Sequence, residues 1–178
     1  KFPNVSQPFT EIQYMMGDKT EQHLDVLFCR EFLPRFFIAL NYNIDFSPGF
    51  YKRSKSQNSY FNANLRYNTK NDRYGISGYY FHDKIDIQEN GGLVYDSIFI
   101  NNKETDRSII SVNLSDATNL IKISGFAVDQ YFNILGPNKK VNDSISKKRK
   151  IDIGRINYHF GYQSNKYVYE DGRPLSSF

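Results

Sequence analysis

Three stretches of the chain carry amide or charged side chains at every second position. Groups of these types hydrogen-bond water, and when they line a hydrated passage they set its charge preference. They could also hydrogen-bond to one another across a closed, plugged lumen. Either way, the alternating pattern predicts pore-facing residues, which are Asn41, Asn43, Asp45, Asn62, Asn64, Arg66, Arg155, Asn157 and His159.

Covalent and metal chemistry have weaker support in the sequence. No nucleophile motif such as GxSxG stands beside His23, His82 or His159, so we expect no catalytic residues and no enzyme. The single cysteine, Cys29, cannot form an internal disulfide, and no Cys/His cluster has the spacing of zinc ligands. We expect neither a metal nor a cofactor. An acidic series matches no EF-hand spacing, and its members are Asp83, Asp86, Glu89, Asp96, Glu104 and Asp106.

A nucleic-acid partner is not expected either. Residues 147–150 form a basic run, KKRK, but the net charge of the chain is only +4. No basic stripe with interleaved aromatic residues accompanies the run. In a barrel this run would lie in a periplasmic connection, where it meets anionic lipid or water.

The elements that position the polar residues are long strands. Residues 36–46, FFIALNYNIDF, alternate apolar and polar side chains over eleven positions. Eleven residues suit a tilted strand that crosses a bilayer and exceed the usual length of soluble strands. The same alternation recurs in residues 59–68 and from Ile156 to Tyr162.

Weaker alternation elsewhere brings the count to about seven strands. Two of them, at 74–87 and 119–134, leave open which residues share a face. Short turns alternate with long loops at 47–58 and 88–118, which places these loops on the extracellular side of an outer-membrane barrel. The sequence contains no run of about 18 apolar residues, so we expect no membrane-spanning helix. The predicted strands are 8–16, 22–31, 36–46, 59–68, 74–87, 119–134 and 151–166.

Several segments resemble the putative porin family of Bacteroidota outer-membrane β-barrel proteins. They are SPGFY (47–51), KNDRYGI (70–76), QENGG (88–92), VNLSDA (112–117) and GRINYHFGYQSNKYVYED (154–171). The resemblance implies an all-β, antiparallel transmembrane β-barrel in the bacterial outer membrane, with more than seven strands. We therefore expect the chain to be a segment of a larger barrel.

The function expected from the strand pattern and this resemblance is passive passage of small solutes, with outer-membrane lipid around the barrel. One alternative is a structural or binding barrel that docks other outer-membrane proteins through residues 47–58 and 88–118. A second is a soluble β-sandwich that binds a ligand, in which the apolar side chains would face a core. The polar positions are rich in Asn, Asp, Arg and Gln, which favours a hydrated lumen over a soluble surface.

Overall fold

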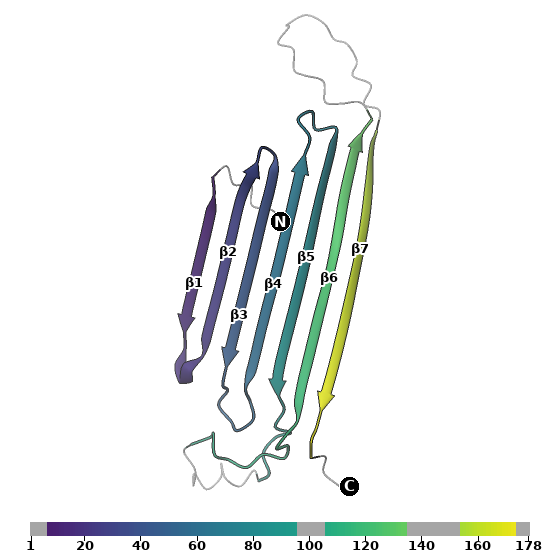
Figure 1. Ribbon diagram of the computed structural model, residues 1–178. Helices are drawn as coiled ribbons and strands as arrows, with labels where there is room; N and C mark the ends of the chain where they lie inside the picture. The colour runs from purple at the N-terminus through teal and green to yellow at the C-terminus, as the bar shows by residue number, and fades with distance from the viewer. Residues whose placement is uncertain (1–6, 96–105, 135–153, 174–178) are drawn as a thin grey trace, which may run out of the picture.

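The computed structural model describes residues 7–95, 106–134 and 154–173, and almost all of its regular structure is β-strand (Figure 1). A short 3-10 helix, η1 (Asp18–Thr20), lies in the first hairpin turn. No helix among the described residues is long and apolar enough to cross a membrane. The strands are β1 (Phe9–Met16), β2 (Gln22–Leu33), β3 (Phe36–Ser47), β4 (Ser56–Asn68), β5 (Tyr74–Gln88), β6 (Thr118–Asn133) and β7 (Arg155–Glu170).

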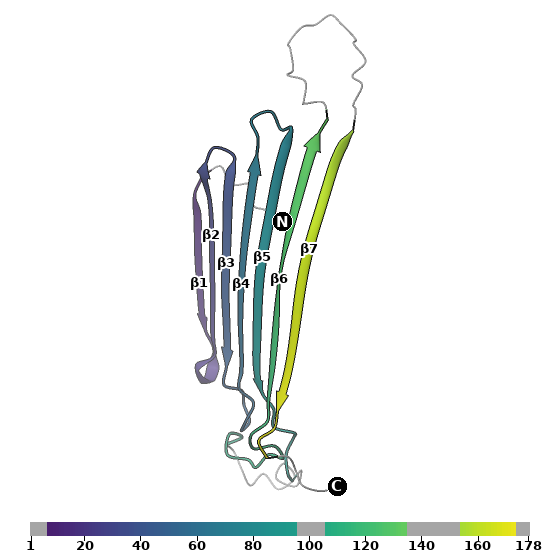
Figure 2. The same ribbon diagram turned by 45° about the vertical axis from the view of Figure 1, so that its right-hand side comes forward.

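All seven strands form one antiparallel sheet in which each strand pairs with its neighbours in sequence. The sheet is open, with β1 and β7 as its edges, and the strands lengthen from β1 to β7 (Figures 1 and 2). No second sheet covers either face within the described part of the chain, so the soluble sandwich is not the fold observed. The predicted all-β, antiparallel class is confirmed.

The connections divide the sheet into two ends. At the turn end, residues 34–35 join β2 to β3, residues 69–73 join β4 to β5, and residues 134–154 join β6 to β7. At the opposite, loop end, residues 48–55 join β3 to β4 and residues 89–117 join β5 to β6 (Figure 1). The two predicted long loops therefore lie at the same end of the sheet.

Cross-strand pairing separates the side chains into two sets. Directly paired residues share a face of the sheet, and successive residues of a strand alternate between faces. Asn41 pairs with Leu27 and Asn62, whereas Leu40 pairs with Phe28 and Ala63. We name the two surfaces the Asn41 face and the Leu40 face.

The observed strand bounds differ from the predicted ones mainly at β2, β4 and β7. β2 continues past a register shift to Leu33, and β4 begins at Ser56 because Ser56 pairs with Ser47 of β3. The connection predicted at 47–58 is therefore 48–55, and the one predicted at 88–118 is 89–117. β7 runs from Arg155 to Glu170, whereas the prediction was 151–166, and residues 151–153 lie outside the described residues.

A reversal of polarity explains why β7 was misplaced and why β5 and β6 were ambiguous. In the loop-end half of these strands, most of the apolar side chains move to the Asn41 face and the charged or hydroxyl side chains to the Leu40 face, although Leu120 and Val168 stay on the Leu40 face. A pattern that assumes one apolar face per strand fails at this change. The apolar residues that change face are Ile85, Ile87, Ile121, Ile123, Tyr167 and Tyr169.

Glycine at position 125 is required by the packing between β5, β6 and β7. A Cβ there would lie 2.7 Å from the carbonyl oxygen of Tyr162 and 2.8 Å from the Phe81 ring. We expect Gly125→Ala to lower the free energy of unfolding by about 1–3 kcal/mol, the usual range for overpacking. Urea unfolding of the full-length protein in lipid vesicles measures the change. Gly78→Ala is the control, because its Cβ would meet only the Ala127 carbonyl oxygen, at 3.7 Å; equal losses would contradict the prediction.

Candidate passage-lining surface

All nine residues predicted to line a pore lie on the Asn41 face. Asn41 and Asn62 are direct partners on β3 and β4, and on this face the pairing continues through Phe81 of β5 and Gly125 of β6 to Gln163 of β7. The other predicted residues lie in neighbouring rows of paired residues, toward either end of the strands. The nine side chains thus share one surface, although they form two groups, one on β3 and β4 and the other on β7.

A hollow of about 490 Å³ near the turn end joins one residue of the first group to the β7 group. Arg66 of β4 lines it with Arg155, Asn157 and His159 of β7. The Arg155 guanidinium lies 3.8 Å from the centre of the Tyr131 ring, within the range of a cation–π contact. This ring in turn covers Gly75, where a Cβ would fall 2.2 Å from it. The glycine and the aromatic ring therefore position the arginine.

The histidine of this hollow is held by a carboxylate. His159 Nδ1 lies 2.6 Å from Asp129 Oδ1, so the imidazole N–H donates a hydrogen bond across the β6–β7 pair. Arg66 and Arg155 give the hollow two positive charges, and Asp129 offsets one of them. The arrangement can bind water and polar or anionic groups.

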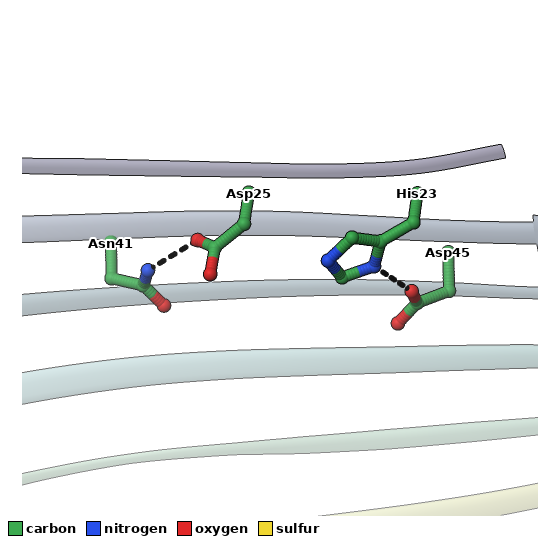
Figure 3. Close-up of polar contacts among 4 residues, drawn as sticks. All are labelled: His23, Asp25, Asn41 and Asp45. Carbon is green, nitrogen blue, oxygen red and sulfur yellow. Dashed lines mark hydrogen bonds and ion pairs between the residues drawn. The ribbon is translucent and has the colours of Figure 1, made fainter. Parts of the chain in front are cut away.

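The middle of the Asn41 face, toward the loop end, is acidic. Asn41 donates a hydrogen bond of 2.7 Å to Asp25, and His23 contacts Asp45 (Figure 3). Asp83 lies on the same face, because Asp25, Asn43, Tyr60 and Asp83 form one cross-strand row. No lysine or arginine occupies the paired positions of this face between the rows of Asn41 and Asp45.

Two oxygen acceptors of this acidic zone are unused within the described structure. Asp83 Oδ1 and Asn58 Oδ1 make no hydrogen bond with described residues. Asn58 pairs with Asp45, so both oxygens lie in the zone that contains Asp25 and Asp45. Carboxylate and amide oxygens attract hydrated cations, but the described residues contain no cluster of three or more metal-ligating side chains.

The Leu40 face exposes large apolar side chains. Leu65 is 45% exposed, Tyr80 44% and Tyr162 60%. Exposed apolar area on this scale marks a surface that contacts lipid or another protein. The Leu40 face therefore has the chemistry expected of a lipid-facing surface.

The loop-end limit of this apolar surface lies closer to the turn end on the last three strands than on β1 and β3. On β3 it reaches Phe46, which is level with Asp86 of β5 and Val168 of β7. On β5 and β7 the apolar run ends at Tyr80 and Tyr162, each six residues closer to the turn end. β1 reaches the level of Phe46 too, so the limit is level on β1 and β3, moves six residues toward the turn end between β3 and β5, and is level again from β5 to β7. Strands that are tilted to the bilayer normal, as in transmembrane barrels, meet the membrane surface at different residue levels.

The two connections at the loop end pack against each other. Arg53 donates a hydrogen bond of 2.6 Å to the carbonyl oxygen of Ala117, and the Arg107 guanidinium lies 5.9 Å from the Tyr51 ring centre. Within the longer connection, Ser108 donates two hydrogen bonds to Asp106, first from its hydroxyl and second from its backbone N–H. These bonds hold the pKa of the Asp106 carboxyl below its usual value.

The sequence pattern missed several polar residues of the Asn41 face. Asp25, Asp83 and Asp129 belong to it, but their strands had weak or ambiguous alternation. The hairpin turns carry the signal that could have found them, because a turn fixes which residues pair. The basic run at 147–150 and the acidic residues Asp96 and Glu104 lie outside the described residues.

Comparison with known proteins agrees with the resemblance seen in the sequence. The model of the family described as "Putative porin" matches residues 1–178, the whole chain. Searches of curated proteins and of solved structures found no significant match. On the strength of the family match, this chain belongs to the putative porin family.

Proposed function

We propose that the chain forms part of a bacterial outer-membrane β-barrel and lines a hydrated passage for small polar solutes. One observation carries the proposal: outside the loop-end half of β5, β6 and β7, the strands in register place polar residues on the Asn41 face and exposed apolar residues on the Leu40 face. A transmembrane barrel strand has this division, with lipid on one side and a polar lumen on the other. Membership of the putative porin family supports an outer-membrane, porin-like role.

Closure of the sheet belongs to the same proposal. The open edges β1 and β7 present unpaired backbone groups, which a bilayer cannot satisfy. Further strands pair with these edges in the complete barrel, and strand tilt accounts for the change in level of the apolar limit between β3 and β5. The loop end lies outside the cell, and the turn end faces the periplasm.

Solutes in this passage meet two electrostatic zones. The acidic zone of Asp25, Asp45 and Asp83 lies toward the loop end, and the hollow with Arg66 and Arg155 lies toward the turn end. Charged rings of this kind select by sign rather than by covalent chemistry. The proposed role is passive and non-enzymatic, and it involves no cofactor and no nucleic acid.

Conductance in a planar lipid bilayer tests the proposal. The full-length protein should fractionate with outer membranes and migrate on a gel in a heat-dependent manner. After reconstitution it should give stepwise currents. A membrane-inserted protein that passes no current would contradict passage, and a detergent-independent soluble protein would contradict the barrel itself.

A second candidate function is structural or binding. The packed loop end, in which Arg53 binds the Ala117 carbonyl oxygen, supports it because this contact forms a compact surface that a partner could dock on. A barrel of this kind, with a plugged lumen, would insert into the membrane without conducting. The bilayer measurement therefore separates the two functions.

A further inference from the structure

Three lysines stand side by side on the Leu40 face. Lys84 of β5 pairs with Lys122 of β6, and Lys122 pairs with Lys166 of β7. Direct cross-strand partners have Cβ atoms about 5 Å apart. The three ammonium groups thus form one row across adjacent strands.

A row of like charges costs stability unless an anion lies near it. Like charges directly opposite each other destabilise a strand pair. Lys84 Nζ has one weak ion pair, 4.0 Å from Asp86 Oδ2. Lys122 and Lys166 form no ion pair with any described residue. The other titratable side chains nearby on this face are His82 and Glu170, and Glu170 forms no ion pair with any described residue, so the row keeps a net positive charge.

The neighbouring rows place the lysines relative to the apolar surface. A row of three aromatic side chains lies four residues from the lysines, toward the turn end, and consists of Tyr80, Phe126 and Tyr162. Between the aromatic and lysine rows, Ser124 and Ser164 follow His82 across the strands. Along the Leu40 face, therefore, aromatic, hydroxyl-rich and cationic rows succeed one another. Aromatic belts mark the level where the hydrocarbon of a membrane ends.

The spacing fits a headgroup layer. Four strand residues span about 13 Å, which at the tilt of about 35–45° that is usual for barrel strands is roughly 10 Å along the membrane normal. The interfacial layer extends roughly 5–8 Å beyond the hydrocarbon. The flexible stem of lysine covers the remaining distance, because it can bend its ammonium group back toward the interface.

We infer that Lys84, Lys122 and Lys166, with the hydroxyls of Ser124 and Ser164, form a binding site for the phosphate of an anionic lipid headgroup in the outer leaflet. The inference rests on the proposed function, because it requires the Leu40 face to meet lipid. Phosphate oxygens accept hydrogen bonds from both ammonium and hydroxyl groups, and the negative charge offsets the repulsion within the row.

The test measures the affinity of the detergent-solubilised full-length protein for phosphatidylglycerol in mixed micelles by native mass spectrometry. We expect Lys122→Gln with Lys166→Gln to weaken this affinity about 25-fold, since each lysine near an anionic surface contributes about fivefold. A matched control, Lys52→Gln with Lys70→Gln, removes the same charge from two exposed turn positions and should change the affinity less than twofold. Lys122→Arg with Lys166→Arg should preserve the affinity within about threefold.

The alternative outcomes each overturn the inference. Equal losses in the two glutamine pairs would mean that only net charge matters, and an unchanged affinity would mean that the lysine row binds no lipid. Full competition by inorganic phosphate would identify a site for free phosphate rather than for a lipid headgroup. Conductance is a separate readout: if lipid binding depends on Lys122 and Lys166 but no current flows, the lipid site stands and the proposed passage fails.

Discussion

Arginine at position 40 should strongly destabilise the membrane-inserted protein, whereas arginine at position 41 should not. Leu40 lies near the middle of the apolar stretch of β3, and Asn41 is its neighbour on the opposite face. Arginine on the lipid side at the bilayer midplane costs about 2–4 kcal/mol. We therefore expect Leu40→Arg to lower the equilibrium constant for insertion and folding by a factor of roughly 30 to 1000. Urea titration in lipid vesicles measures this constant.

Asn41→Arg is a matched control. Its new side chain would replace an amide that already contacts the Asp25 carboxylate, so the added charge gains an opposite charge beside it. The free energy of unfolding should change by less than about 1 kcal/mol. If Asn41→Arg destabilises the inserted protein as much as Leu40→Arg does, the assignment of the two faces is wrong.

Removing the three carboxylates of the acidic zone should reduce the preference of the passage for cations. The variant combines Asp25→Asn, Asp45→Asn and Asp83→Asn, which keeps the side-chain shapes and removes the charges. A unit charge about 6 Å from a permeating ion contributes about 0.7 kcal/mol in water, or about threefold in occupancy. The cation-to-anion permeability ratio should therefore fall by roughly tenfold or more in dilute salt, as measured by reversal potentials under a salt gradient.

Salt and position provide the controls for this variant. The effect should shrink in about 1 M salt, where the screening length falls to about 3 Å. Asp86→Asn with Glu170→Gln removes two carboxylates from the Leu40 face, so the permeability ratio should stay near that of the unchanged protein. A larger shift from this pair than from the triple variant would place the passage on the other face.

The strands with uniform alternation could be predicted from sequence. Residues 36–46 alternate without a break and correspond to β3, which ends one residue later, at Ser47. One face of this strand is apolar along its whole length, so a single period describes it. The predicted polar side chains of β3 and β4 share a face for the same reason.

The limits of prediction appear where the environment changes along a strand. Beyond Tyr80 and Tyr162 the Leu40 face becomes charged, and residues such as Ile85 and Tyr167 turn the Asn41 face apolar. When one alternation of apolar and polar residues is assumed across this change, the predicted strand bounds are shifted from the observed ones. The same assumption also hides the in-register lysines, because their alignment depends on pairing between strands rather than on spacing within one.

The sequence predicted only part of the hollow near the turn end, namely the shared face of its residues. Arg66 and Arg155 were predicted to share a face, but β4 and β7 are separated by two strands whose facing was ambiguous. Their common cavity also depends on Gly75, which leaves room for the Tyr131 ring beneath Arg155. A packing relation of this kind involves three strands and has no local sequence signal.

The most direct test of the central claim is thiol labelling of single channels at two adjacent residues. Asn62 lies on the Asn41 face and Ala63 on the Leu40 face, and both are on β4. In a Cys29→Ser background, a charged, water-soluble thiol reagent should reduce the current through the Asn62→Cys channel and leave the Ala63→Cys channel unchanged. If the Ala63→Cys channel is blocked while the Asn62→Cys channel is not, or if neither protein conducts, the Asn41 face does not line a hydrated passage.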